Sequence, residues 1–154
     1  MRDEPRVEVV TPRPLAVVHE SAIPAADVPQ RIRDLLGEVW TTLRATGPAT
    51  GHNVAIYDRA WREGGRLVFD ARFGVEAFGP FSATARVVAA ATPAGRVAVA
   101  THWGPYSELG VTYGALHAWC AATHLALAGP SWEVYGDWSD DPAQLRTDLF
   151  LLLA

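Results

Sequence analysis

Two stretches of the chain, Thr11-Pro12-Arg13-Pro14-Leu15-Ala16-Val17-Val18 and Thr92-Pro93-Ala94-Gly95-Arg96-Val97-Ala98-Val99, share one turn-then-strand pattern. Further matches follow in the same order along the chain, and the offset between matched positions hardly changes. They are Trp40 with Trp119, Ile56-Tyr57 with Val134-Tyr135, and Leu67 and Asp70 with Leu145 and Asp148. Ordered matches at a nearly constant offset indicate two copies of one supersecondary unit.

The first copy reads strand, helix, strand, strand. Residues 15–19 form an apolar run typical of a strand, and residues 7–10 are expected to extend it or to pair with it. A helix is expected after Asp27, which with Gln30 forms a capping-box pattern, and Gly47-Pro48 should end it. Strands at 53–58 and 67–75 are expected to form a hairpin across Gly64-Gly65.

The second copy repeats this order. Strands are expected at 86–91, 96–101, 131–135 and 145–152, with a helix from a Ser107 cap to about His124. The inner face of that helix is marked by Leu109, Tyr113, Leu116 and Cys120. The sequence therefore predicts an α+β fold, a tandem pseudo-twofold repeat of two β-α-β-β modules with a mostly antiparallel sheet, two helices and a central cleft. We expect a single domain over 1–154, with repeat one at about 7–78 and repeat two at about 85–154.

Composition excludes several partners. The chain of 154 residues has 13 basic and 17 acidic residues and a formal charge of −4, without an arginine run that could follow a phosphate backbone. Direct nucleic-acid binding is therefore not expected. No apolar stretch reaches the length of a membrane span, and the N-terminus lacks the apolar core of a secretory signal. We expect a cytoplasmic protein that does not enter a membrane.

Signatures of cofactor and metal chemistry are missing from the sequence. It contains no glycine-rich phosphate loop, no G-x-S-x-G and no H-E-x-x-H pattern. His117 and His124 lie two helical turns apart, too far to share one metal, and are expected to be solvent-facing or core histidines. Cys120, on the apolar helix face, is expected to be a small core residue and not a nucleophile. No cofactor and no metal are expected.

Glu133 is the acidic residue that stands out. In Ser131-Trp132-Glu133-Val134-Tyr135, strand alternation places Glu133 and Tyr135 on one face and Trp132 and Val134 on the other. The first copy has alanine at the matching position, Ala55. If the Glu133 face is the inner one, the carboxylate is desolvated, its pKa rises, and it needs hydroxyl donors or a ligand. If the face is an outer one, a solvated glutamate has no further role.

Aromatic residues gather in the second copy. Trp103 and Tyr106 lie in His102-Trp103-Gly104-Pro105-Tyr106, and Tyr113 follows on nearly the same helical stripe. Rings around an acid suit a flat, apolar, cationic compound. Any one ring alone could also fill the core, but the set of rings together favours a ligand site. Trp61 and Trp138 are expected in matching loops, either closing over ligand or packing on the adjacent hairpin.

These residues resemble a known family. Thr92-Pro93-Ala94-Gly95, His102 to Tyr106, Leu116 to Trp119, and Trp132-Glu133-Val134-Tyr135 with the closing apolar strand are similar to the GyrI-like small-molecule-binding domain. That domain also serves as the effector-binding half of some AraC-type and MerR-type regulators. The resemblance covers nearly the whole chain. It implies a pocket between the halves for hydrophobic, often cationic drugs, with the acid at Glu133 and the tyrosine of the Gly-Pro-Tyr element at Tyr106.

Three functions from different classes remain open at this point. The first is a stand-alone module for multidrug sensing or sequestration, with a ligand site of Glu133, Trp103, Tyr106, Tyr113, Tyr135, Trp40 and Trp138. The second, which the resemblance also implies, is a hydrolase that opens cyclopropane-type electrophiles. There Glu133 would be the general base, and Tyr106 or Tyr135 would orient the leaving oxygen. The third is a protein-interaction domain that modulates a partner such as gyrase. Binding and turnover both need an acid among rings, so the sequence does not separate the first two.

Overall fold

A computed structural model describes residues 4–154 of the chain. The elements follow in the order β1 (Arg6–Val10), β2 (Pro14–Pro24), α1 (Val28–Thr46), β3 (Thr50–Glu63), β4 (Arg66–Ala77), β5 (Val87–Ala91), β6 (Gly95–Trp103), α2 (Leu109–Ala122), β7 (Leu127–Tyr135) and β8 (Arg146–Leu153), with short 3₁₀ turns before α1, α2 and β8. The α+β class and the two helices predicted from the sequence are confirmed.

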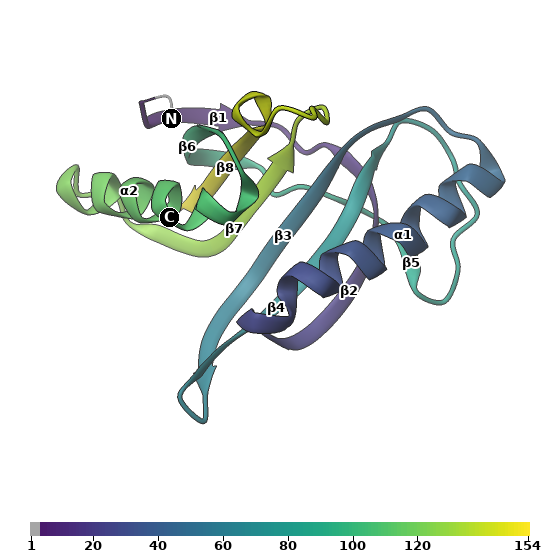
Figure 1. The fold of residues 1–154 in the computed structure, drawn as a ribbon, viewed down its shortest axis with the longest axis horizontal. Coiled ribbons are helices and arrows are strands. Elements are labelled where there is room, and N and C mark those ends of the chain that lie inside the picture. Colours follow the sequence, from purple (N-terminus) through teal and green to yellow (C-terminus); the bar gives the residue numbers. More distant parts are fainter. Residues whose placement is uncertain (1–3) are drawn as a thin grey trace.

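All eight strands belong to one antiparallel sheet in the order β1-β6-β8-β7-β3-β4-β2-β5. This order is symmetric about the contact between β7 and β3: β8 and β4 flank that pair, and β6 and β2 lie beyond them (Figure 1). Each half therefore has the same strand arrangement, as the internal repeat predicts. At the centre, Ala55 pairs with Glu133, which is also its match in the repeat. The pseudo-twofold axis consequently passes through the Ala55–Glu133 pair.

The first strand of each half crosses to the other half. β1 pairs with β6, with Val10 opposite Gly95, and β5 pairs with β2, with Pro14 opposite Ala91. The expectation that residues 7–10 extend or pair with the following strand is therefore wrong. The Pro12 and Pro14 region separates β1 from β2, so the chain cannot turn back as a tight hairpin there. The exchange joins the two halves at both edges of the sheet.

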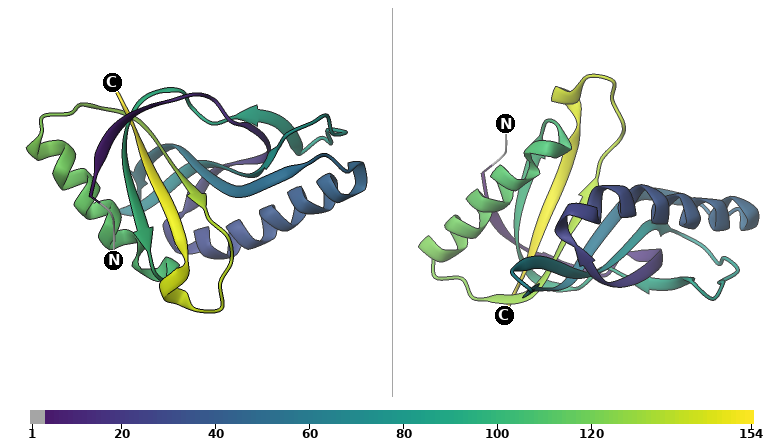
Figure 2. Two further views of the ribbon diagram at one scale, coloured as in Figure 1. Left: turned by 90° about the horizontal axis from the view of Figure 1, so that it is seen from above. Right: turned by 60° about the horizontal axis from the view of Figure 1, so that its bottom comes forward.

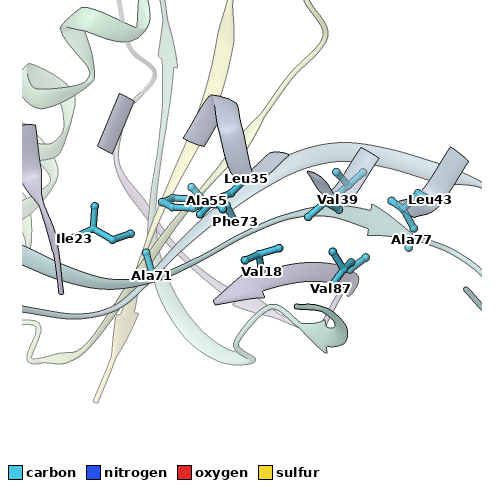
Figure 3. Packing of buried hydrophobic residues seen from close by; sticks show 12 residues of the cluster. Val18, Ile23, Leu35, Val39, Leu43, Ala55, Ala71, Phe73, Ala77 and Val87 are labelled. Atoms are coloured by element: carbon cyan, nitrogen blue, oxygen red, sulfur yellow. The ribbon is translucent and has the colours of Figure 1, made fainter. Parts of the chain in front are cut away.

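Both helices cover the same face of the sheet. α1 lies over β2 and β4, and α2 lies beside β6 and β8, on the other side of the centre (Figure 1, Figure 2). Under α1, Leu35, Val39 and Leu43 contact strand residues that include Val18, Phe73 and Ala77 (Figure 3). Under α2, Leu116 and Cys120 pack on Ala98, Ala100, Leu149, Leu151 and Leu153. Each helix thus buries one half, and the central strands β3 and β7 lie between them.

The opposite face of the sheet has a core of its own. Strand residues there pack against one another without a helix. The buried members are Leu15, Val17, Val54, Ile56, Val97, Val99, Trp132 and Val134. Trp132 stacks on Phe150 with ring centroids 5.1 Å apart. The sheet is therefore buried on both faces, which explains the nearly continuous burial along β6.

Both helices begin and end close to the residues predicted from the sequence, whereas the predicted N-terminal capping hydrogen bonds do not form. Gly47 ends α1 with φ 71° and donates its amide to the Leu43 carbonyl at 2.8 Å. Asp27 makes no side-chain cap bond, and the Gln30 amide donates to Asp34 instead, so the capping box does not form. Ser107 lies in a 3₁₀ turn before α2 and does not cap it. Within residues 4–154, neither helix is both long and apolar enough to cross a membrane.

Candidate functional site

A cavity of about 510 Å³ opens above the central strands, between the two helices. It is bounded by the N-terminal end of α1, the β3–β4 hairpin, the side of α2 that carries Tyr113 and His117, β7 and the end of β8. Its lining residues are Ala25, Val28, Pro29, Tyr57, Ala60, Leu67, Phe69, Tyr113, His117, Leu127, Gly129, Pro130, Ser131, Glu133, Leu151 and Leu152. The volume falls within the range of small-molecule sites.

Glu133 is the buried acid of this cavity, with only 5% of its surface exposed. Its position follows from β7, where alternation turns Glu133 toward the helices and Trp132 and Val134 toward the opposite core. The sequence-based prediction of these two faces is therefore confirmed, and the solvated outer face is excluded. Burial raises the pKa of the Glu133 carboxyl above its ordinary value.

Two tyrosine hydroxyls hold the carboxylate. Tyr113 on α2 donates to Oε1 of Glu133 at 3.0 Å, and Tyr135, on the same strand as Glu133, donates to Oε2. These donors favour the ionised form and lower the pKa of Glu133, but less than burial raises it. Glu133 has no ion-pair partner among residues 4–154. A negative charge in this cavity is therefore held by hydroxyls alone.

Tyr57 brings the other half of the molecule into the site. It lies on β3 opposite Ser131, diagonally across from Glu133, and it lines the cavity. Its ring packs on Phe69 with centroids 5.0 Å apart. The pKa values of Tyr57, Tyr113 and Tyr135 are all raised, first by burial and then by the negative charge of Glu133. All three hydroxyls therefore remain protonated at neutral pH, and those of Tyr113 and Tyr135 donate to Glu133.

Of the predicted site residues, Glu133, Tyr113 and Tyr135 are brought together, and Tyr106 lies beside them. The rings of Tyr106 and Tyr135 meet edge to face at 5.5 Å, but Tyr106 is exposed and does not line the cavity. Its pKa is raised by partial burial.

Three predicted tryptophans lie elsewhere. Trp40 packs beside the α1 core and donates its indole N–H to Asn53 at 2.9 Å. Trp138 is 71% exposed in the loop after β7. Trp103 lines a second cavity of about 500 Å³ on the opposite face of the sheet, where the Arg146 guanidinium lies 5.7 Å from its ring centroid.

The matching-loop prediction for Trp61 and Trp138 is wrong for Trp61. Trp61 belongs to β3, opposite Val68, because the β3–β4 hairpin is longer than its apolar pattern indicated. The Arg59 guanidinium lies 4.4 Å from its ring centroid.

Tyr57, Phe69 and His117 also line the cavity, although no pattern in the sequence was interpreted as placing them there. The position of Tyr57 could have been predicted, because Tyr57 matches Tyr135 in the repeat.

Cys120 is 1% exposed in the core beneath α2, and burial raises its thiol pKa, as expected for a residue that is not a nucleophile. Within residues 4–154, no group of three or more histidine, cysteine or acidic side chains is arranged to hold a metal ion.

Comparison with known families decides where the chain belongs. The model of the GyrI-like small molecule binding domain matches residues 3–154. The chain belongs to the GyrI-like family. The resemblance drawn from its motifs is thereby confirmed, and binding of small molecules is the general property of the domain.

Solved structures share the fold at low identity. The C-terminal domain of EcmrR is 16% identical with a TM-score of 0.79, and the match covers 98% of this chain and 97% of that one. SAV2435 bound to tetraphenylphosphonium is 12% identical with a TM-score of 0.63, and 99% and 94% of the two chains are covered. A hydrolase from Listeria innocua is 13% identical with a TM-score of 0.59, covering 98% and 92%. No curated protein sequence matches the chain.

Proposed function

We propose that this GyrI-like domain binds hydrophobic cations that carry flat aromatic groups, in the cavity between its two halves, with Glu133 as the anionic anchor. The observation that carries the proposal is Glu133 itself: a carboxyl 5% exposed, held by two hydroxyls and by no cationic side chain of residues 4–154. An ionised carboxylate in such a place lacks a counter-charge. A bound cation would supply it.

The remaining lining supports the apolar part of this ligand class. Leu67, Phe69, Leu127 and Leu151 offer apolar surface, and the ring of Tyr57 offers a face for stacking or for a cation. A structural neighbour of this fold was solved with tetraphenylphosphonium, a permanent cation with four phenyl groups. Such a compound is a suitable first probe for the proposed site.

The proposal is tested by comparing a cation with a neutral compound of similar shape. Tetraphenylphosphonium and triphenylphosphine oxide would be titrated into wild type and Glu133→Gln at neutral pH by calorimetry. Loss of the carboxylate removes the counter-charge of the phosphonium, so binding of tetraphenylphosphonium should weaken by about 1–4 kcal/mol, the Coulomb energy of two nearby unit charges between bulk water and a protein surface, and binding of the neutral compound should weaken less. Equal losses for both compounds would remove Glu133 as the anchor. Absence of all binding by wild type would favour the protein-interaction alternative.

Hydrolysis of a strained electrophile is a second candidate function. It is favoured by the hydroxyl-bonded acid in the cavity, whose raised pKa suits a general base, and a neighbour with this fold is described as a hydrolase. In this reaction Glu133 would take a proton from water, whose oxygen bonds to a cyclopropane carbon as the strained C–C bond to that carbon breaks, and the electron pair of the broken bond would move onto a conjugated carbonyl oxygen of the substrate. The Tyr135 hydroxyl, which lies at the Glu133 carboxylate, would hydrogen-bond the substrate oxygen that receives the negative charge. Turnover of a cyclopropane-containing alkylator by wild type, abolished in Glu133→Gln, distinguishes this function from binding alone.

A further inference from the structure

His117 shares the cavity with Glu133. It follows Tyr113 by one helical turn on α2, so both side chains project from the same face of that helix. Tyr113 reaches down to Oε1 of Glu133, whereas His117 is exposed. The imidazole therefore lies at the mouth of the cavity and the carboxyl at its floor.

Few other residues that line the cavity can change charge. The α1 end contributes Ala25, Val28 and Pro29, and β8 contributes Leu151 and Leu152. The β3–β4 hairpin contributes Tyr57 and α2 contributes Tyr113, whose raised pKa values keep both neutral. Among the lining residues, Glu133 is the acid and His117 is the base, so their charged forms have opposite signs.

We infer that His117 is a specificity-determining residue that makes cation affinity depend on pH, by placing a removable positive charge at the mouth of the cavity; this inference rests on the proposed function. A histidine changes charge between about pH 5 and 8. When His117 is protonated, it opposes entry of a cation and partly offsets the charge of Glu133. When it is neutral, the cavity carries the negative charge of Glu133 alone. By linkage, a bound cation disfavours protonation of His117, so binding near the middle of this pH range releases a proton.

The test uses tetraphenylphosphonium, because its charge does not depend on pH. Wild type, His117→Gln and the control His19→Gln would be titrated by calorimetry from pH 5.5 to 8. His19 is exposed on β2 and lines neither cavity, so the control removes a histidine without touching the site. On going from pH 8 to 5.5, wild type and His19→Gln should lose roughly three- to ten-fold more affinity than His117→Gln, as expected for two unit charges in a partly solvated site.

Glu133 also titrates, and its contribution must be separated from that of His117. Glu133→Gln should retain a fall in cation affinity at low pH, because His117 is still present, and the double variant Glu133→Gln/His117→Gln should show none. Repeating the calorimetry in two buffers of different ionisation enthalpy gives the number of protons released, which should be larger for wild type than for His117→Gln.

The outcomes separate the inference from the proposed function. If His117→Gln and wild type bind the cation with the same pH profile and the same proton release, the role of His117 is wrong while the proposed site stands. If wild type does not bind tetraphenylphosphonium at any pH, the proposed function and the inference both fail. A larger loss for triphenylphosphine oxide than for the cation at low pH would also contradict a charge effect at His117.

Discussion

At the scale of single residues, Glu133 makes the stability of the empty protein depend on pH. Burial raises its pKa in the folded state, so the folded protein binds this proton more tightly than the unfolded chain does. The stabilising effect of the proton is complete below the unfolded pKa of a glutamate, near 4.3, and is lost as pH rises toward the folded pKa. The free energy of unfolding of wild type minus that of Glu133→Gln should therefore fall as pH rises from 4 to 8.

Urea denaturation at several pH values measures this difference. Glu63→Gln is the matched control, because it removes a carboxyl group that is exposed to solvent. A difference that grows with pH would mean that the hydroxyl donors outweigh desolvation at Glu133.

The tyrosine donors give a second prediction at this scale. The hydroxyl of Tyr113 lowers the pKa of Glu133, so Tyr113→Phe should raise that pKa further and weaken binding of a cation at neutral pH. Tyr106→Phe is the control, because the ring of Tyr106 contacts Tyr135 and its hydroxyl makes no bond to the carboxylate. The carboxyl ¹³C shift of Glu133, followed against pH, reports the result. An unchanged pKa of Glu133 in Tyr113→Phe would show that the hydrogen bond from Tyr113 does not lower it.

Part of this group of residues around Glu133 was predicted from the sequence alone. The alternation along β7 placed Glu133 and Tyr135 on one face, and the helix stripe placed Tyr113 toward the sheet. Trp103 was grouped with them because it shares the segment His102-Trp103-Gly104-Pro105-Tyr106 with Tyr106, but in the structure it lines the second cavity, on the opposite face of the sheet. Tyr57 enters the site through strand pairing between the halves, which no local pattern specifies.

At the scale of elements, the contact between β4 and β2 depends on Gly74. A Cβ atom there would lie 2.2 Å from the Ala16 carbonyl oxygen and 2.5 Å from Cγ1 of Val17. Gly74→Ala should therefore destabilise the fold by about 1–3 kcal/mol or more, because backbone must shift to accept the methyl group.

Gly37 on α1 is the matched control for Gly74. A Cβ atom added at Gly37 meets nothing within 4 Å, and the position is exposed. Gly37→Ala should stabilise the protein by about 0.5–1 kcal/mol, since alanine favours the helix. Urea denaturation of both variants measures the two effects. Equal stabilities of Gly74→Ala and wild type would contradict the close approach of β2 and β4.

The helices and the central hairpin were predictable because their signals are local. Gly47 stops α1 with a positive φ, and the Gly64-Gly65 turn has φ values of 57° and 79°, which glycine adopts freely. The partner of β1 was not predictable, because an edge strand followed by a proline-rich link can join either half. β1 pairs with β6, and this pairing depends on how the two halves of the sheet join, not on the residues of β1 alone.

At the scale of the whole molecule, the internal repeat accounts for the position of the site. Two similar halves join through β3 and β7, each helix covers its own half, and the cavity remains above the join. The pseudo-twofold axis passes through Ala55 and Glu133, so one half contributes a small residue and the other contributes the charge. The repeat of one unit accounts for the cavity at the join, and the difference between Ala55 and Glu133 at one matched position accounts for the acidic side chain in it.

The most direct test of this account is the crystal structure of the protein with tetraphenylarsonium, whose arsenic atom is located by anomalous scattering. The account predicts one strong peak in the cavity between α1 and α2, with the phenyl rings against Tyr57, Phe69 and Tyr113 and the charge facing Glu133. A peak only in the second cavity, beside Trp103 and Arg146, or no peak at saturating ligand, would contradict it.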